Sequence, residues 1–556
     1  MSPDLDRRKF IGLFSGLGAA ALLAPEVLAQ EEVEKVALAA IEQAEALTGL
    51  RFTPEERELM AEGVAEHRES FRKLREIPLA NSVPPAVRFS PLLPGRTPPA
   101  GEGVMMATPV RDVRRVEGPD LAYLPVTHLA ALVRDRQITS SELTRFYLER
   151  LKRLNEKLFC VISYTDKLAM EQAARADREI AAGKYRGPLH GIPYGLKDLF
   201  AVPSYRTTWG AMPYREQILP ETSTVARKLE EAGAVLIAKT SVGALAWGDV
   251  WFEATTKNPW NLEQGSSGSS AGSAAGTSAG CFGFSIGTET LGSIISPSHR
   301  CGVTGLRPTF GRVSRHGAMA LSWTMDKVGP LCRQVEDCVL VLHAIRGSDG
   351  HDPCVIDAPL AWDARSDATR LRLGYDAEAF EQDNPDRKLQ DAALAKLRSM
   401  GFALRPVKLP DLPAGDLLFI LESEAAAAFD DLTRSGRDDL LVRQIANAWP
   451  NVFRAARLVP AVEYINANRA RTLLMERMER VFDTVDAYVH PTYAGGTLLA
   501  ANLTGHPSVI VPNGFREDGT PSSITFTGNL FREGELCRVA KAYQDATGFH
   551  RRRPLH

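Results

Sequence analysis

The residues best suited to chemistry lie at positions 258–312, where Gly and Ser alternate with small apolar residues. Within this stretch, Ser293 follows Gly292, and a tight Gly-Ser turn can expose the hydroxyl while neighbouring backbone N–H groups converge on an oxyanion. The string GxSxG also occurs, at 268–272 and at 276–280. A run this rich in Gly and Ser produces that string by chance, and neither copy follows a clear strand.

A Gly/Ser-rich composition by itself favours a flexible linker. Apolar residues are threaded through this one, however, which indicates a segment that can be buried; they are Ala271, Ala274, Ala275, Phe282, Phe284 and Ile286. A serine is also a poor nucleophile without a base, and none of the eleven histidines lies in a recognisable triad context. Lys197, in the sequence GIPYGLKDLF, is flanked by apolar residues, and burial would favour its neutral, basic form. The sequence therefore predicts a hydrolytic site built from serines and a lysine.

Composition bounds the other possibilities. The chain has 556 residues, with 66 basic against 68 acidic side chains, so a nucleic acid is not an expected general partner. Its seven cysteines are too few and too scattered for a disulfide framework, and no Cys/His spacing matches a metal site. The length fits either one large catalytic domain with additions or two to four small domains.

The first 29 residues resemble a twin-arginine export signal. Arg7 and Arg8 precede Phe10, an uncharged stretch follows to Pro25, and small residues suited to a signal peptidase end at Ala29. The apolar stretch is shorter than the roughly 20 residues of a membrane span, which argues against a permanent anchor. We expect an exported, periplasmic protein cleaved after about Ala29. The alternatives are an uncleaved anchor or a chance basic-apolar start.

Residues 30–103 are predicted to form a helical extension followed by a Pro-rich linker. Helical spacing runs through 30–76, with Thr53 and Pro54 as a helix start. Seven prolines between 77 and 103 then indicate a linker or an extended strap packed on the main body. The helices could cover or extend a pocket or make a homodimer contact.

The main domain, 104–556, alternates strand-like and helix-like runs. Strands are predicted at 235–238 and 488–490, and helices at 143–157, 224–232 and 461–485. This alternation indicates an α/β fold with helices on both faces of a sheet.

Five ordered segments carry a resemblance to the amidase signature family. They are Gly191-Ile192-Pro193 leading to Lys197-Asp198, Asn258-Pro259-Trp260-Asn261, Gly268-Ser269-Ser270, Gly287 to Ile294, and Cys301 to Thr309. The likeness extends to Asp326-Lys327-Val328-Gly329-Pro330 and to Asn502 through Pro507, and covers about Leu124 to the end. It implies the amidase signature fold, a large mixed β-sheet core with helices on both faces.

The resemblance also implies a Ser-cis-Ser-Lys triad that needs no metal or cofactor. Ser293 matches the nucleophile, Ser269 the bridging serine after Gly268, and Lys197 the base; the two serines stand 24 residues apart, as in the family. The implied oxyanion hole consists of the backbone N–H groups of Thr290, Leu291, Gly292 and Ser293.

The substrate of this chain is harder to infer from the family resemblance than the triad is. The family commonly has Asp-x-Gly-Gly-Ser-Ile-Arg, whereas this chain has the bulkier Leu291 before Gly292 and Ile295 in place of the Arg. We expect hydrolysis of a linear carboxylic amide, with a small-molecule or peptide amide as substrate. The alternatives are an A-type amidotransferase component that uses glutamine and acts on aminoacyl-tRNA, and a non-catalytic binding protein that keeps the fold.

Overall fold

The computed structural model describes residues 37–101, 103–111, 113–493 and 496–554. The expected export signal at 1–29 lies outside the described residues. Contacts divide the chain into two compact units, Met1–Ala80 and Asn81–His556.

In the first unit, helix α2 (Leu38–Thr48) packs against α3 (Pro54–Leu74). Thr53 caps α3 in a capping box with Glu56, with Pro54 at the first helical position, as the sequence indicates. Arg57 binds Glu45 through two hydrogen bonds of 2.6 and 2.8 Å.

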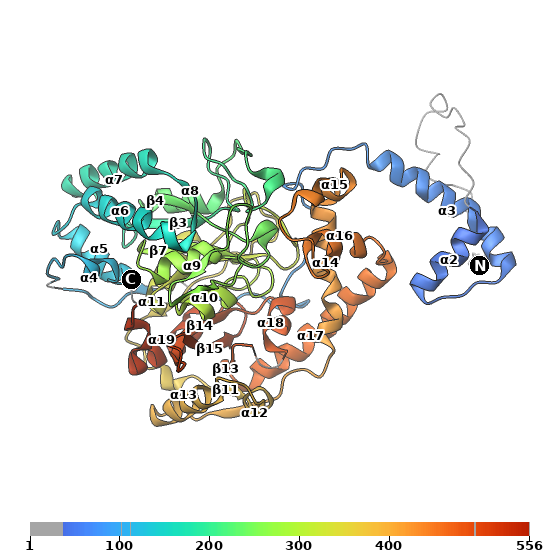
Figure 1. The fold of residues 1–556 in the computed structure, drawn as a ribbon. Helices are drawn as coiled ribbons and strands as arrows, with labels where there is room; N and C mark the ends of the chain where they lie inside the picture. Colours follow the sequence, from blue (N-terminus) through green and yellow to red (C-terminus); the bar gives the residue numbers. More distant parts are fainter. Residues whose placement is uncertain (1–36, 102, 112, 494–495, 555–556) are drawn as a thin grey trace, which may run out of the picture. The chain divides into compact units, whose positions relative to one another are not determined.

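The second unit is built on one mixed 11-stranded sheet, with the strand order β12-β11-β13-β15-β14-β8-β9-β7-β3-β4-β2 (Figure 1). Strands β3, β4 and β7 run parallel, as do β11, β12 and β13, and the remaining pairs are antiparallel. The strands of this sheet are β2 (Val161–Tyr164), β3 (Pro193–Lys197), β4 (Val235–Thr240), β7 (Phe284–Glu289), β8 (Thr304–Arg307), β9 (Lys327–Cys332), β11 (Leu373–Asp376), β12 (Arg405–Val407), β13 (Ala487–Pro491), β14 (Ser508–Phe515) and β15 (Pro521–Gly528). Two short two-stranded pairs accompany it, β1 (Met105–Met106) with β10 (Trp362–Asp363) and β5 (Lys257–Asn258) with β6 (Asn261–Gly265).

Helices cover both faces of the sheet. α9 and α10 pack on one another and on the central strands, whereas α11 and α19 form a second pair that packs on β8, β9, β14 and β15 (Figure 1). The helices of the second unit are α4 (Pro119–Ala122), α5 (Val126–Arg134), α6 (Ser140–Leu158), α7 (Asp166–Ala181), α8 (Thr224–Glu231), α9 (Ala271–Ser278), α10 (Ile295–Cys301), α11 (Val335–Ile345), α12 (Ala377–Glu381), α13 (Arg387–Ser399), α14 (Phe419–Ala428), α15 (Asp430–Arg434), α16 (Trp449–Ala456), α17 (Ala461–Thr484), α18 (Thr497–Thr504) and α19 (Glu533–Thr547). The fold is the predicted α/β arrangement.

The Gly/Ser-rich stretch is part of the core. All eight residues of α9 are buried, and close neighbours explain why they are small. A Cβ on Gly272 would lie 2.5 Å from the backbone nitrogen of Ser241, and one on Gly276 would lie 2.3 Å from the Phe282 ring. Small residues here let a helix lie directly against the sheet.

The Pro-rich segment packs on the main body from Asn81 onward. The Asn81 side chain exchanges two hydrogen bonds with the backbone of Ala320, at 2.7 and 2.8 Å. The Phe89 ring lies edge-on to Phe310 with the Arg471 guanidinium 3.6 Å from its centre. These contacts favour the strap interpretation over a free linker for this segment.

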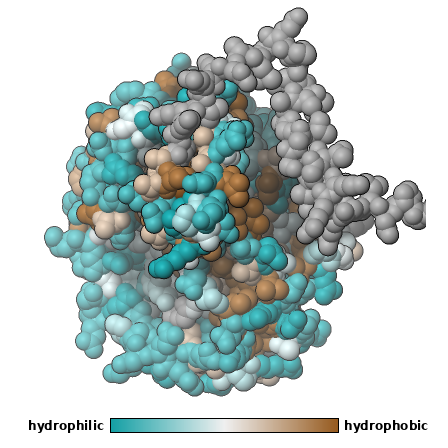
Figure 2. Space-filling view, turned by 90° about the vertical axis from the view of Figure 1, so that its right-hand side faces the viewer, coloured by the Kyte–Doolittle hydropathy of each residue, from teal (hydrophilic) through white to brown (hydrophobic). Residues whose placement is uncertain are grey.

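The surface in Figure 2 is mainly hydrophilic, with apolar side chains gathered in patches. The exposed large apolar residues of the second unit include Leu458, just before α17, and Val462 and Ile465 in its first turns. Within the described residues, no helix is both long and apolar enough to cross a membrane. All seven cysteines are free, and six of them are buried.

Candidate active site

Lys197 is the last residue of β3 and is completely buried. Its Nζ lies 2.8 Å from Ser269 Oγ, 2.8 Å from Thr288 Oγ1 and 3.1 Å from Ser270 Oγ. Parallel strands β3 and β7 end at the same edge of the sheet, so the lysine and the residues after β7 meet there. The partners of the Nζ atom are thus neutral groups: these three hydroxyls and, at 3.4 Å, the Thr288 carbonyl oxygen.

Burial lowers the pKa of Lys197 well below its ordinary value, against the opposing effect of the Asp326 and Glu289 charges. In the part of the chain that the structure describes, no carboxylate lies within 4 Å of its Nζ. A buried amine without a counterion favours its neutral form. Lys197 can therefore accept a proton from a hydroxyl group.

Ser269 follows a cis peptide bond to Gly268, as the family resemblance implies. A side chain at 268 is excluded, because a Cβ there would lie 1.8 Å from the carbonyl oxygen of Gly248. The preceding turn is held by Asp249, whose carboxylate accepts a 2.9 Å hydrogen bond from the Ser267 N–H. The chain therefore presents the buried Ser269 hydroxyl to Lys197.

Ser293 lies in the loop between β7 and α10. Gly292 before it has φ of 81°, a left-handed conformation that glycine adopts without strain. The Ser270 N–H donates a 3.1 Å hydrogen bond to the Ser293 carbonyl oxygen, which ties the two serine segments together through their backbones. Among the described residues no hydrogen bond joins the hydroxyl groups of Ser269 and Ser293. Ser293 is 7% exposed.

Glu289, buried at the end of β7, holds the loop that carries Ser293. One carboxylate oxygen accepts the N–H groups of Ile294 and Ile295, at 2.8 and 2.9 Å. The other accepts from Arg307 at 2.8 Å and from Asn502 at 2.9 Å. Burial alone would raise the pKa of Glu289, but Arg307 and the Ile295 N–H together lower it to about 2. Glu289 is therefore an ionised anchor for the loop at all ordinary pH values.

Thr290 is fixed by a second, half-buried carboxylate. Its hydroxyl donates to Asp326 at 2.5 Å, and the other Asp326 oxygen accepts the N–H groups of Leu321 and Ser322. Leu291 is half-buried and packs against the apolar cluster that contains Leu321. The predicted oxyanion-hole residues thus form one loop, held at Glu289 and at Asp326.

The structure brings Lys197 and Ser269 into direct contact, and it joins the backbone of Ser293 to that of Ser270, the residue after Ser269. Four residues of this arrangement had no role in the sequence analysis: Ser270, Thr288, Glu289 and Asp326. Each lies inside a segment that resembles the family, so a signal was present, but nothing in the sequence indicated which side chains meet. Asn502 and Arg307 converge on Glu289 from distant segments in the same way.

A family model described as "Amidase" matches residues 142–499. The chain belongs to the amidase signature family. It is 33% identical over 479 residues to the A-type component of the glutamyl-tRNA(Gln) amidotransferase of Marinomonas sp. (strain MWYL1), covering 77% of this chain and 98% of that protein. The corresponding protein of Methylococcus capsulatus is 32% identical over 478 residues, with the same coverage.

Among solved structures, the native peptide amidase of Stenotrophomonas maltophilia is similar to this amidase-family chain. It is 29% identical, with a TM-score of 0.70, and the match covers 78% of this chain and 98% of the peptide amidase. An amidase family protein from Bacillus anthracis, 24% identical with a TM-score of 0.70, shares the fold. The chain is therefore an enzyme of a family that acts on C–N bonds. Within the described residues, no cluster of three or more His, Cys, Asp and Glu side chains is placed to hold a metal ion.

Proposed function

We propose that this enzyme hydrolyses a linear carboxylic amide through an acyl-enzyme on Ser293. The observation that carries the proposal is the 2.8 Å contact between the buried Lys197 Nζ and Ser269 Oγ, at the sheet edge where Ser293 lies. A base without a counterion, a bridging hydroxyl and a serine in a tight turn are the parts of a proton relay.

In the proposed reaction, Ser293 Oγ attacks the amide carbonyl. Its proton passes to Ser269 as the Ser269 proton passes to Lys197. The N–H groups of the loop from Thr290 to Ser293 stabilise the oxyanion. When the C–N bond breaks, Lys197 returns its proton through Ser269 to the leaving amine. Water then attacks the acyl-enzyme, with the same relay accepting its proton, and Ser293 regains its hydrogen as the carboxylic acid leaves.

The competing function is that of an amidotransferase component. The relatives named as A-type components of glutamyl-tRNA(Gln) amidotransferase support it, because their chains match over almost their whole length. Both functions share the acyl-enzyme and differ in the acceptor of the released ammonia. The balanced charge of this chain and the resemblance of residues 1–29 to an export signal favour the independent amidase.

Ammonia release by the isolated protein separates these functions. We expect turnover of primary amides, from aliphatic and aryl amides to C-terminally amidated peptides, without any partner protein, and no turnover by Ser293→Ala. Glutamine hydrolysis that requires added partner proteins would support the amidotransferase instead. Absence of turnover with every amide, in a protein that also fails to react with fluorophosphonates, would favour a binding protein that keeps the fold.

We also propose that residues 1–29 direct export through the twin-arginine route. The adjacent Arg7 and Arg8 before an uncharged stretch support this proposal. Replacing both arginines with lysine should leave the protein in the cytoplasmic fraction, whereas the wild type should be periplasmic with its N-terminus near Gln30. A wild-type protein that still begins at Ser2 would contradict cleavage.

A further inference from the structure

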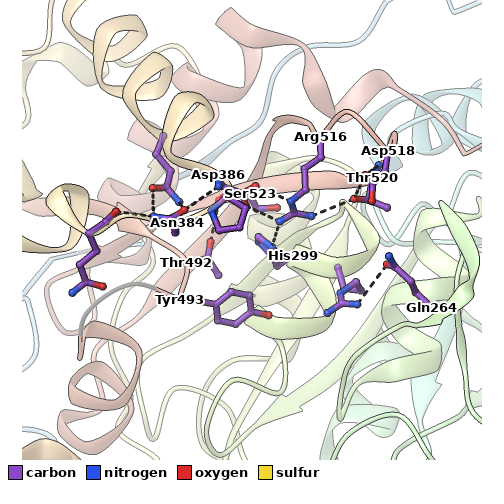
Figure 3. A pocket seen from close by; sticks show the side chains of 14 residues that line it. Gln264, His299, Asn384, Asp386, Thr492, Tyr493, Arg516, Asp518, Thr520 and Ser523 are labelled. Atoms are coloured by element: carbon purple, nitrogen blue, oxygen red, sulfur yellow. Dashed lines mark hydrogen bonds and ion pairs between the residues drawn. The ribbon is translucent and has the colours of Figure 1, made fainter.

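A cavity lies beside the C-terminal half of α10, the helix that begins just after Ser293. Its lining comes from segments far apart in the sequence: β6, α10, the start of α13, the end of β13 and the β14–β15 hairpin (Figure 3). Gln264, His299, Arg300, Asp386, Tyr493 and Arg516 are among the side chains that line it. The cavity has no role in the reaction proposed above.

One of the two arginines in the cavity has a counterion. Arg516 binds Asp386 with two hydrogen bonds of 2.7 and 2.6 Å, and Ser522 donates to the same carboxylate at 2.9 Å. A bidentate ion pair of this kind compensates the charges of both groups. Asp518, another lining acid, accepts hydrogen bonds from the backbone N–H and the hydroxyl of Thr520, at 2.9 and 2.6 Å.

His299 is neutral and rigidly placed. Burial, with a contribution from the Arg516 charge, lowers its pKa to about 3. Arg516 donates a 3.0 Å hydrogen bond to its Nε2, so the ring hydrogen is on Nδ1, which has no partner among the described residues. The ring packs edge-on against Tyr493, with ring centroids 4.9 Å apart, and so fixes the tyrosine at the edge of the cavity (Figure 3).

Arg300 is different because no carboxylate in the described residues lies within 4 Å of its guanidinium. Its one hydrogen bond there is a long one, 3.5 Å, to the Gln264 side-chain oxygen. That oxygen also accepts from Asn258 at 3.4 Å, which leaves the Gln264 NH2 group without a partner among the same described residues. A half-buried cation therefore lies next to an amide donor that has no partner among the described residues.

The cavity lies at the far end of α10, the helix that begins just after Ser293, and Lys197, Ser269 and Ser293 are not among its lining residues. Ser293 stands two residues before α10 and Arg300 in its last turn, so at a rise of 1.5 Å per residue their backbones lie roughly 10 Å apart along the helix direction. Ser296 and Arg300 lie on one face of α10, four residues apart, and both are half-buried where their neighbours are buried. The Tyr493 hydroxyl donates a 3.4 Å hydrogen bond to the carbonyl oxygen of Ser296, which lies in sequence between Ser293 and Arg300.

We propose that this cavity binds a carboxylate in the acyl part of the substrate, held by the Arg300 guanidinium with the Gln264 amide. The carboxylate supplies the counterion that Arg300 lacks within the described residues, and the donors match its acceptor oxygens. The preferred substrates are then amides that carry an acidic group about 10 Å from the scissile carbonyl, which is the length of about three extended residues. This inference rests on the proposed amidase function.

Two isosteric peptide amides test it, acetyl-Glu-Ala-Phe-amide and acetyl-Gln-Ala-Phe-amide, assayed by ammonia release. The wild type should show kcat/KM at least about 10-fold higher for the Glu peptide, mainly through a lower KM, because the bond to Arg300 is charge-assisted. In Arg300→Gln the ratio of the two kcat/KM values should fall close to one. Arg300→Lys should keep an intermediate ratio, and it serves as the second variant should Arg300→Gln unfold.

Arg227→Gln is the matched control, since Arg227 is a surface arginine of α8 paired with Glu231 at 2.6 Å. Its ratio should equal that of the wild type. A wild-type ratio near one, or a high ratio that survives in Arg300→Gln, would overturn the carboxylate site while leaving the amidase function intact. If neither peptide nor any neutral amide is cleaved, the amidase function fails first and this inference fails with it.

Discussion

Lys197 and Lys239 lie on neighbouring parallel strands and are both completely buried, yet their surroundings are opposite. Lys239 forms a 2.6 Å ion pair with Asp198 and donates to the Arg206 carbonyl oxygen and the Thr207 hydroxyl. The partners of Lys197 are the hydroxyl groups of Ser269, Ser270 and Thr288 and, at 3.4 Å, the Thr288 carbonyl oxygen. One lysine is paired as a cation, and the other is held among neutral groups.

This difference distinguishes a lysine that stabilises the fold from one that can take part in proton transfer. Burial lowers the pKa of both side chains, but for Lys239 the Asp198 charge opposes the change directly. For Lys197 the opposing charges of Asp326 and Glu289 act without contact, and its pKa lies well below the ordinary value. A buried lysine without a counterion is thus the candidate for proton transfer.

The largest expected loss of activity comes from Ser293, the serine that Lys197 is proposed to activate. Ser293→Ala removes the group that the relay serves, so amide hydrolysis should fall by roughly 10⁴-fold or more, as for other serine nucleophiles. The rate of ammonia release and the melting temperature are measured together. A folded variant that keeps a tenth of the wild-type activity would refute the assignment of the nucleophile.

Lys197→Met should cause the next largest loss of activity. Loss of a general base costs about 10²- to 10⁴-fold in rate. Since the variant replaces an uncompensated buried amine with an apolar chain of similar size, the free energy of unfolding should stay the same or rise. The rates on amide and activated-ester substrates are compared, because an activated leaving group needs less help from a proton donated by Lys197 through Ser269. Equal losses on both would contradict the role of Lys197.

Lys239→Met should have the opposite effect, a large loss of stability with a much smaller loss of activity. It leaves Asp198 buried without its cation, which typically costs about 3–5 kcal/mol of stability. Denaturant unfolding should detect the loss, and the remaining folded protein should lose much less activity than Lys197→Met does. Should Lys239→Met be as stable as the wild type, the two lysines would not differ as described.

Thr290→Val tests the loop from Thr290 to Ser293, whose N–H groups are proposed to stabilise the oxyanion. It removes the hydroxyl bonded to Asp326, and a hydrogen bond to a charged group is worth about 1.5–3 kcal/mol. We expect kcat to fall about 10-fold with little change in KM, and Thr290→Ser to retain most of the rate. A change confined to KM would indicate a substrate contact instead of an oxyanion-loop contact.

The smallest effect is a shift in pH dependence. Activity needs neutral Lys197, so it should rise with pH as this amine loses its proton. Asp326 is one of the two charges that raise the pKa of Lys197. Asp326→Asn should therefore move the acid limb of kcat/KM to lower pH, whatever the variant does to the maximum rate. A shift to higher pH would contradict this electrostatic relation.

Local pattern predicted much of this structure. The helix expected at 143–157 is Ser140–Leu158, and the strand expected at 488–490 is Ala487–Pro491, because amphipathic spacing and cap residues are local signals. The order of the motifs likewise predicted Lys197, Ser269 and Ser293 as site residues, and their catalytic roles remain predictions. Their separation in the sequence does not show how far apart they lie in space, however. The contact between Lys197 and Ser269 follows from the parallel pairing of β3 with β7.

Other features depend on the sheet order, which periodicity does not encode. Asn502 reaches Glu289 because β14, which follows it, pairs with β8 in the middle of the sheet. The α10 cavity needs five separate segments to converge. Composition was misleading for 271–278, where small residues that favour a linker form a buried helix whose neighbours leave no room for larger ones.

The central claim is that a neutral Lys197 activates Ser293 through Ser269. Its most direct test is reaction of the wild type, Lys197→Met and Lys239→Met with a fluorophosphonate, with rates followed by mass and the adduct located in a digest. We predict one adduct, on Ser293, formed at least about 100-fold more slowly in Lys197→Met and at a rate near that of the wild type in folded Lys239→Met. An adduct on another residue, or equal rates in the wild type and Lys197→Met, would contradict the account.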